Sequence, residues 1–196
     1  MLAHLNALGP PRERTVAWHK PTAAVELGRR LSGRDYLAAI KDGQLPEPPI
    51  ARLAGIEALR IDPGDTLYRC VPDESFLNPI GLIHGGLICT LLDYAAASAM
   101  LATLPAGAGF TTIELKVSYL RPVRAGDTLL VHGWITKRGG RISFAEADLR
   151  DDQDRLVATA SSSLLVITAS ATSRSAASDA TPLRELRNEE HDDGNS

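Results

Sequence analysis

One stretch of this chain restricts its possible folds more than any other, because it is apolar or small on nearly every side. It runs from about His84 to Leu104 and is followed by Pro105 and a glycine-rich segment, which end a helix. A helix without a polar face has to be enclosed, so the stretch predicts a sheet wrapped around it. Its length, with His84, Asp93 and two glycines inside it, favours a buried helix over a membrane span.

The residues after the predicted helix alternate in polarity, as half-buried strands do. Between 112 and 120 one side carries Ile113, Leu115, Val117 and Tyr119, and the other carries Thr112, Glu114, Lys116 and Ser118. Further strands are predicted at 128–136, 142–149 and 156–167, and a hairpin at 54–71 precedes the helix. Short turns make consecutive strands antiparallel neighbours. The order of elements predicts an α+β fold, with an antiparallel curved sheet around one long central helix.

Composition divides the chain into an N-terminal arm at 1–50, a globular domain at 51–168 and a tail at 169–196. The arm combines helix-forming patches at 23–30 and 33–41 with a rigid connector, Pro46-Glu47-Pro48-Pro49. The tail is rich in Ser and Ala and then in charge, with almost nothing apolar to bury. It is therefore expected to be disordered.

The charge and the cysteines exclude several classes of protein. A net charge of −3 lacks the clustered basic excess of proteins that bind nucleic acid. Cys70 and Cys89 have no metal-ligand spacing and form no disulfide framework, so no metal site is expected, and a reducing compartment is. Prolines and scattered charges interrupt residues 1–20, where a secretory signal needs an apolar core. The expected location is the cytoplasm.

Asp93 is the residue of the predicted helix that packing alone does not explain. Burying an unpaired ionisable group costs several kcal/mol or forces it to take up a proton, so an acid at this place indicates chemistry. A general base speeds a reaction by about 10²- to 10⁴-fold. A structural acid, paired with an arginine or capping backbone N–H groups, is the alternative.

The start of the same helix offers the second part of a reaction site. A helix N-terminus presents free N–H donors and the positive end of its dipole, which stabilise negative charge on an oxygen. Gly85 and Gly86 allow a substrate to approach this backbone closely. The simpler interpretations are that His84 only starts the helix and that Asn78, before Pro79, only forms a turn.

Two motifs, in this order, carry a resemblance to a known family. The first is Asn78-Pro79-Ile80-Gly81-Leu82-Ile83-His84-Gly85-Gly86 with Asp93 after it, and the second runs from Thr111 to Pro122 and ends in Tyr-Leu-Arg-Pro. Together they resemble the PaaI-like acyl-CoA thioesterases of the hot-dog fold, over about residues 50 to 168. The resemblance implies hydrolysis of the thioester between an acyl group and coenzyme A, without a metal or an organic cofactor.

The resemblance also implies roles for single residues. Asp93 matches the catalytic carboxylate. Gly86 and Gly85 match the backbone donors to the carbonyl oxygen. Asn78 and His84 match polar residues of the pocket. Thr112 matches a hydroxyl residue that orients water, and Thr111 takes this place after a shift of one residue. The acid acts either as a general base on water or as a nucleophile.

Asp93 and Gly86 are too far apart along one helix to share a carbonyl group. Asp93 lies seven residues beyond Gly86, which is about 10 Å of helix, whereas reacting atoms come within about 3 to 3.5 Å. An antiparallel helix of a second subunit can bring its Asp93 to this chain's Gly86, and twofold symmetry then creates two equal sites. We expect an obligate dimer, and the resemblance suggests a dimer of dimers.

Two groups of basic residues are candidates for holding the coenzyme A phosphates. One is Lys137-Arg138-Gly139-Gly140-Arg141, where basic side chains stand beside glycine N–H groups, and the other is Arg121 with Arg124. A solvated basic hairpin is the alternative for the first group.

The sequence leaves two questions open, which acyl group is bound and which reaction is catalysed. Small residues from Ala95 to Ser98 leave room for an aromatic or medium-chain acyl group, or they allow close helix packing. A non-catalytic module that binds or senses acyl-CoA is the rival function, and Asp93 argues against it. A hydratase or dehydratase on acyl thioesters is the weaker rival, because the Asp/His or His/Glu arrangements of such enzymes are not found.

Overall fold

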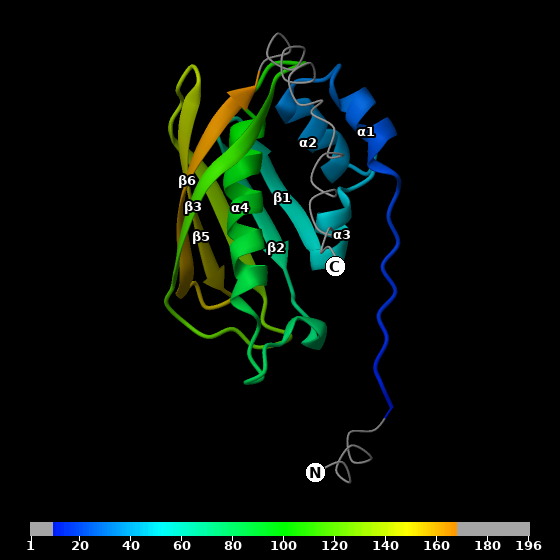
Figure 1. Cartoon of the computed structure of the whole chain (residues 1–196), viewed down its shortest axis with the longest axis vertical. Coiled ribbons are helices and arrows are strands. Elements are labelled where there is room, and N and C mark those ends of the chain that lie inside the picture. Colours follow the sequence, from blue (N-terminus) through cyan, green and yellow to red (C-terminus); the bar gives the residue numbers. More distant parts are fainter. Residues whose placement is uncertain (1–9, 168–196) are drawn as a thin grey trace, which may run out of the picture.

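The computed structural model describes residues 10–167, and Figure 1 shows how their helices and strands are arranged. In chain order the elements are α1 (Pro21–Gly28), α2 (Gly33–Lys41), α3 (Pro49–Ala54), β1 (Ile56–Asp62), β2 (Asp65–Cys70), the 3₁₀ helix η2 (Glu74–Phe76), α4 (Gly85–Leu101), β3 (Gly109–Tyr119), β4 (Leu129–Lys137), β5 (Ile142–Asp151) and β6 (Leu156–Ile167). The tail predicted at 169–196 lies outside the described residues.

The strands form one antiparallel sheet in the order β1-β2-β4-β5-β6-β3. The sheet curves around α4, and α4 contacts every strand of it (Figure 1). This confirms the predicted antiparallel curved sheet around one long helix. β3 is an edge strand that pairs with β6 on one side and, within the described part of the chain, with no strand on the other.

Small residues let α4 lie unusually close to the sheet. A Cβ atom at Gly133 of β4 would come within 2.3 Å of the Ala95 backbone, so only glycine fits there. The buried Thr66 hydroxyl of β2 donates to the Ala95 carbonyl at 3.0 Å. Leu91, Leu92 and Met100 are fully enclosed in the core that results.

Among residues 10–167, no helix combines the length and the apolar character that crossing a bilayer requires.

Two of the N-terminal helices, α2 and α3, pack on the sheet domain, close to the predicted boundary between residues 50 and 51. It falls inside α3, whose Ala51 and Ala54 belong to the hydrophobic core. At α2, the Gly33 N–H donates to the Leu104 carbonyl at 2.9 Å, and a Cβ at Gly33 would collide with the backbone of Leu101. Pro48 is the N-cap of α3 and Pro49 its first residue, since proline is well suited to a first helical turn.

A bulge in β3 changes the side to which its residues point. Thr112 pairs with Leu164 and Glu114 pairs with Ser163, so Ile113 is an extra residue without a partner position. Thr112 therefore faces the core on the same side as Leu115 and Val117, while Ile113 is 52% exposed. The regular alternation predicted for 112–120 is wrong at this point.

Candidate active site

The first turn of α4 forms a small polar surface, which we call the helix mouth and define as His84, Gly85 and Gly86. His84 is the N-cap residue, and its imidazole Nδ1 accepts a hydrogen bond from the Gly86 N–H at 2.9 Å. Within residues 10–167, no protein acceptor bonds the Gly85 N–H. The sequence predicted that both glycine N–H groups are open, and the structure leaves Gly85 open while His84 occupies Gly86.

The segment before the helix mouth is shaped by Asn78. Its Oδ1 accepts hydrogen bonds from the N–H groups of Ile80, at 3.0 Å, and Leu82, at 3.1 Å, and its own N–H donates to the Leu82 carbonyl at 2.7 Å. The Asn78 side chain thus has the turn-forming role that we considered as the simpler interpretation. Its Nδ2 group has no protein partner in the described part of the chain.

Tyr119 fixes the helix mouth from the end of β3. Its hydroxyl donates to the Gly85 carbonyl at 3.1 Å, and its ring lies 3.3 Å from the place of a Cβ at Gly85. Burial raises the pKa of Tyr119, and the nearby Cys89 raises it further, so the hydroxyl keeps its proton and remains a donor. The sequence analysis placed Tyr119 among the apolar residues of its strand and missed this contact.

Asp93 lies in the middle of α4, half-buried, and contacts β3. Its Oδ1 accepts a hydrogen bond from the Thr112 hydroxyl at 3.0 Å. The bulge at Ile113 makes this contact possible, because it turns Thr112 toward the helix. Thr111 is exposed, so Thr112 is the threonine that the structure brings to the acid.

The acid and the helix mouth do not meet within one chain. α4 is continuous from Gly85 to Leu101, so Asp93, seven positions after Gly86, lies about 10 Å further along the helix. Asp93 and Thr112 therefore form one group, and the helix mouth forms another.

The basic hairpin between β4 and β5 lies at the opposite end of α4 from the helix mouth (Figure 1). Arg138 donates to the Thr103 hydroxyl at 3.1 Å, two residues beyond the end of α4, and to the Ser143 hydroxyl at 3.2 Å. Gly139 fits only as glycine, since a Cβ there would collide with the Ile142 carbonyl. The 17-residue helix separates the two ends by about 25 Å. Lys137, Gly140 and Arg141 belong to the same distant hairpin.

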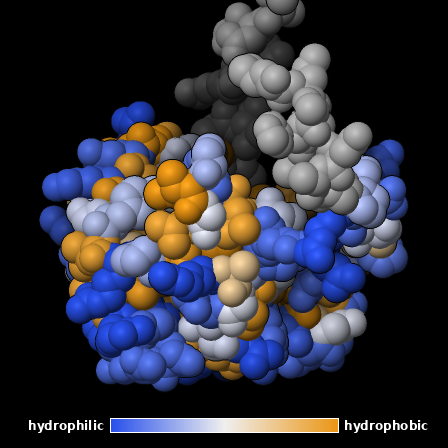
Figure 2. Space-filling view, turned by 90° about the horizontal axis from the view of Figure 1, so that it is seen from below, coloured by the Kyte–Doolittle hydropathy of each residue, from blue (hydrophilic) through white to orange (hydrophobic). Residues whose placement is uncertain are grey.

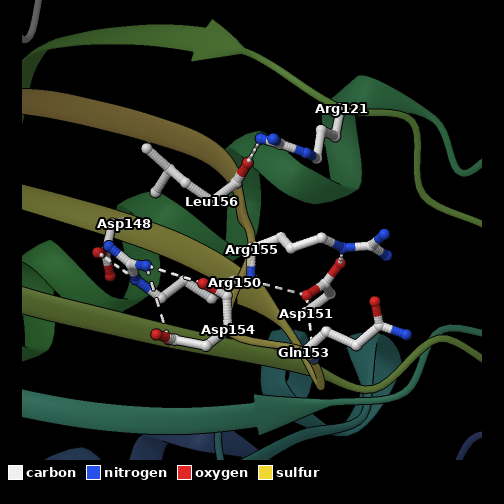
Figure 3. Close-up of polar contacts among 8 residues, drawn as sticks. All are labelled: Arg121, Asp148, Arg150, Asp151, Gln153, Asp154, Arg155 and Leu156. Carbon is white, nitrogen blue, oxygen red and sulfur yellow. Dashed lines mark hydrogen bonds and ion pairs between the residues drawn. The ribbon is translucent and has the colours of Figure 1, made fainter.

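The other basic pair lies on the loop after β3, at the same end as the helix mouth. This loop is tied to the segment before α4 by the Ile83 N–H, which donates to the Val123 carbonyl at 2.9 Å. Figure 3 shows Arg121 donating to the Leu156 carbonyl, at 2.6 Å, near the ion pair of Arg155 with Asp151. The Arg124 guanidinium contacts no carboxylate among residues 10–167.

Cys70 does not supply a nucleophile to this site. The buried Cys70 thiol donates to the Ala54 carbonyl, and burial raises its pKa to about 11, so it is a neutral thiol at physiological pH. No cluster of three or more His, Cys, Asp or Glu residues within 10–167 is arranged to hold a metal ion.

An apolar pocket of about 390 Å³ opens beside the helix mouth. Its lining includes His84 and Gly86 together with Leu53 of α3 and Phe76 of η2. Figure 2 views this end of the molecule and shows hydrophobic surface bordered by hydrophilic residues. A larger cavity, of about 940 Å³, lies between residues 17–20 and the helices α1 and α2, and it shares no lining residue with the pocket at the mouth.

The part of the chain that contains α4 and most of the sheet is similar to a known protein family. Residues 80–158 match the model of the thioesterase superfamily. Human acyl-coenzyme A thioesterase 13 is 29% identical over 97 residues, which are 50% of this chain and 69% of the human protein.

Two solved structures are also similar. A putative thioesterase from Ralstonia eutropha JMP134, described as a phenylacetic acid degradation-related protein, is 32% identical with a TM-score of 0.62, covering 66% of this chain and 98% of that one. The PaaI protein of the E. coli phenylacetic acid degradation operon has the same fold, with 23% identity and a TM-score of 0.61 over 70% of this chain and 96% of its own.

Proposed function

Since the chain belongs to the thioesterase superfamily, as a PaaI-like member with the hot-dog fold, we propose that it hydrolyses the thioester bond of acyl-coenzyme A compounds. The acyl group is small, aromatic or of medium chain length. The reaction needs no metal ion or organic cofactor, because residues of the chain supply both the base and the donors.

The hydrogen bond between Thr112 and Asp93 is the observation that carries this proposal. It fixes one oxygen of a half-buried carboxylate, while the other oxygen, Oδ2, has no protein partner within the described residues. An oriented carboxylate with one free oxygen is suited to take a proton from water as the water attacks a carbonyl carbon. The same oxygen is also suited to attack the carbonyl directly and form an anhydride.

The helix mouth binds the thioester oxygen in this account. A backbone N–H always donates, so His84 Nδ1, which accepts from Gly86, carries no proton. The neutral imidazole then has its proton on Nε2, which is a donor on an exposed residue. The Gly85 N–H and His84 Nε2 therefore serve as donors to the negative charge that develops on oxygen. One such donor is typically worth about 3 to 4 kcal/mol of barrier lowering.

A second copy of the chain completes each site. The continuous helix keeps Asp93 about 10 Å from the helix mouth of its own chain, so the acid at each mouth is Asp93 of the partner subunit. The outer edge of β3, which pairs with no strand among residues 10–167, supports this arrangement, because it presents Ile113 and Tyr119, 52% and 53% exposed, along an 11-residue strand. A long edge strand of this kind is normally covered. A pair of such dimers is the tetramer that the resemblance suggests.

The coenzyme A phosphates bind near Arg121 and Arg124. Both residues lie at the end of α4 that carries the helix mouth, and Arg124 has no carboxylate partner within the described chain. The hairpin residues 137–141 lie about 25 Å away in the same chain, so they serve this role only if a partner subunit brings them to the mouth.

Release of free thiol over a panel of acyl-CoA compounds tests the function. We expect turnover with at least one member of a set that includes acetyl-, hexanoyl-, decanoyl- and phenylacetyl-CoA. Binding of these compounds without any turnover would support the non-catalytic acyl-CoA module instead. A single turnover in ¹⁸O-labelled water separates the two roles of the acid, since only a nucleophilic carboxylate transfers one of its own oxygens to the product.

A further inference from the structure

The pocket beside the helix mouth has walls from two segments that precede the part of the chain matched by the family model. One wall is α3, through Ile50 and Leu53, and the other is η2 and the residue after it, through Phe76 and Leu77. Leu87, in the first turns of α4, forms the base. These walls carry large apolar side chains that remain open to water, with Ile50, Leu53 and Leu77 at 44%, 47% and 39% exposure.

The position of the pocket identifies its occupant. His84 and Gly86 belong to its lining, so a thioester oxygen bound at the helix mouth leaves one substituent of the carbonyl carbon beside an apolar space. The volume of about 390 Å³ is at the lower end of the roughly 300 to 1,000 Å³ of small-molecule pockets. Coenzyme A is polar near its thioester and highly charged at its far end, whereas a medium-chain acyl group is apolar throughout. Removing such a chain from water favours its binding in an apolar pocket.

One side chain of the extended N-terminal segment joins the two walls. Arg14 donates through Nη2 to the Leu53 carbonyl of α3, at 2.8 Å, and through Nη1 to the Ser75 hydroxyl of η2, at 3.1 Å. The same Nη1 lies 3.3 Å from the Asp73 carboxylate, and the guanidinium carbon lies 5.1 Å from the centre of the Phe76 ring. Only a planar, forked guanidinium combines these contacts, because an ammonium group is a single compact charge.

The α3 wall needs this support. α3 has six residues, far fewer than the about 12 to 15 at which an isolated helix becomes stable. The carbonyls of its last turn have no partners inside the helix. Arg14 satisfies Leu53, and the Cys70 thiol satisfies Ala54 at 3.2 Å. Without Arg14, the outer part of the wall loses its main polar attachment to η2.

We propose that the apolar pocket holds the acyl chain of the substrate and that Arg14 is a positioning residue, which sets acyl-chain selectivity by holding α3 against η2. This inference rests on the proposed thioesterase function. It gives the N-terminal segment a role in substrate selection.

The test is the acyl-chain profile of kcat/KM, measured with acetyl-, hexanoyl- and decanoyl-CoA on the full chain. Leu53→Trp fills the pocket, so kcat/KM for the best of the longer substrates is expected to fall at least about tenfold, while acetyl-CoA changes by less than about twofold. Arg14→Lys keeps the charge and loses the fork. It is expected to raise KM for the longer substrates about fivefold or more, with kcat for acetyl-CoA unchanged.

Arg12→Ala is the matched control, since Arg12 lies in the same segment and pairs with Glu74 of η2, with no hydrogen bond or ion pair to α3 among the described residues. Its profile is expected to match the wild type. An unchanged profile in both Leu53→Trp and Arg14→Lys would overturn the inference, as would an equal loss for all substrates, because a pocket for the coenzyme A part predicts that result. A wild-type protein that hydrolyses none of the compounds would instead contradict the proposed function.

Discussion

The two ends of α4 differ in what surrounds their backbone groups. At the N-terminal end, the Gly85 N–H has no protein acceptor within the described residues, and an apolar pocket opens beside it. At the C-terminal end, the Leu104 carbonyl accepts from Gly33, and Arg138 bonds Thr103. The first end leaves a donor unpaired beside open space, and the second is closed by packing. In the proposed function, one helix thus serves binding at its start and stability over most of its remaining length, with Asp93 as the exception between them.

Among the variants that test this difference, Asp93→Asn is expected to have the largest effect on activity. The amide retains the shape of the side chain and an oxygen for the Thr112 hydroxyl, but it cannot take a proton from water. We expect kcat to fall at least about 100-fold while thermal unfolding stays close to the wild type. The exposed Asp62→Asn, at the end of β1, is the control and is expected to keep the wild-type rate. A wild-type rate in Asp93→Asn would show that the catalytic acid is elsewhere.

Gly85→Pro tests the open end of the helix more finely. Proline is accepted at the first helical position and removes one N–H, and the extended backbone of His84, at φ −62° and ψ 134°, suits a residue before proline. We expect kcat to fall by about 10²-fold, as when one oxyanion donor is removed.

Gly85→Ala is the matched control for that experiment. It adds a Cβ at the same place, 3.3 Å from the Tyr119 ring, and keeps the N–H. The alanine variant is expected to retain most of the activity. Equal losses in both variants would assign the effect to crowding against Tyr119 and remove the Gly85 donor from the account.

The basic residues at the two ends are compared directly by Arg124→Gln and Arg138→Gln. Loss of one charged hydrogen bond to phosphate is expected to raise KM about tenfold in Arg124→Gln, with little change in kcat and a weaker dependence on salt. Arg138→Gln loses bonds to Thr103 and Ser143 and is expected to lower stability slightly, with KM within about twofold of the wild type. The reverse order of KM effects would assign the phosphates to the hairpin.

The smallest expected effect concerns Tyr68 of β2, whose hydroxyl lies near Ser98 in the packed part of α4. The effect is on stability at high pH. Burial raises the pKa of Tyr68 to about 12, and the Ser98 hydroxyl approaches Oη without reaching hydrogen-bond geometry. Between about pH 10 and pH 12 the unfolded chain loses this proton and the folded chain keeps it, so the free energy of unfolding falls by about 2 to 3 kcal/mol. Below pH 10 both states keep the proton and the loss vanishes.

Tyr68→Phe is expected to remove this part of the alkaline loss and to leave activity unchanged. Urea unfolding at pH 8, pH 10 and pH 11.5 measures it. Parallel stability curves for the two proteins would contradict the assignment to Tyr68.

The sequence predicted two helices closely, the long one from a continuous apolar stretch that ends before Pro105. The helix predicted at 84–104 is observed as Gly85–Leu101, and the helical patch predicted at 33–41 is observed as Gly33–Lys41. Polarity could not reveal the bulge at Ile113, because residues 112–120 alternate regularly and a strand of either register satisfies that pattern. The contact between Thr112 and Asp93 depends on that bulge. The resemblance pointed to Thr112, or to Thr111 after a shift of one residue, and Thr112 is the threonine that contacts Asp93.

Long-range contacts explain what else the sequence analysis missed. Tyr119 and Gly85 are 34 residues apart, and Arg14 lies 39 residues from Leu53 and 61 from Ser75. A hydroxyl or guanidinium that reaches a backbone carbonyl across such distances leaves no local pattern in the sequence. The hydrogen bond from the Gly86 N–H to His84 is local, by contrast. The sequence indicated it only weakly, because histidine is not among the residues most favoured at the N-cap.

The central claim is that each site joins the helix mouth of one subunit to Asp93 of the partner subunit. Co-expression of equal amounts of Asp93→Asn and Gly85→Pro chains tests it most directly. Random pairing makes half of the dimers mixed, and each mixed dimer contains one site free of both changes and one site with both. The account predicts that the mixture recovers about a quarter of the wild-type activity, although each variant alone is nearly inactive. A mixture no more active than the two separate variants would show that each site lies within one chain and would contradict the account.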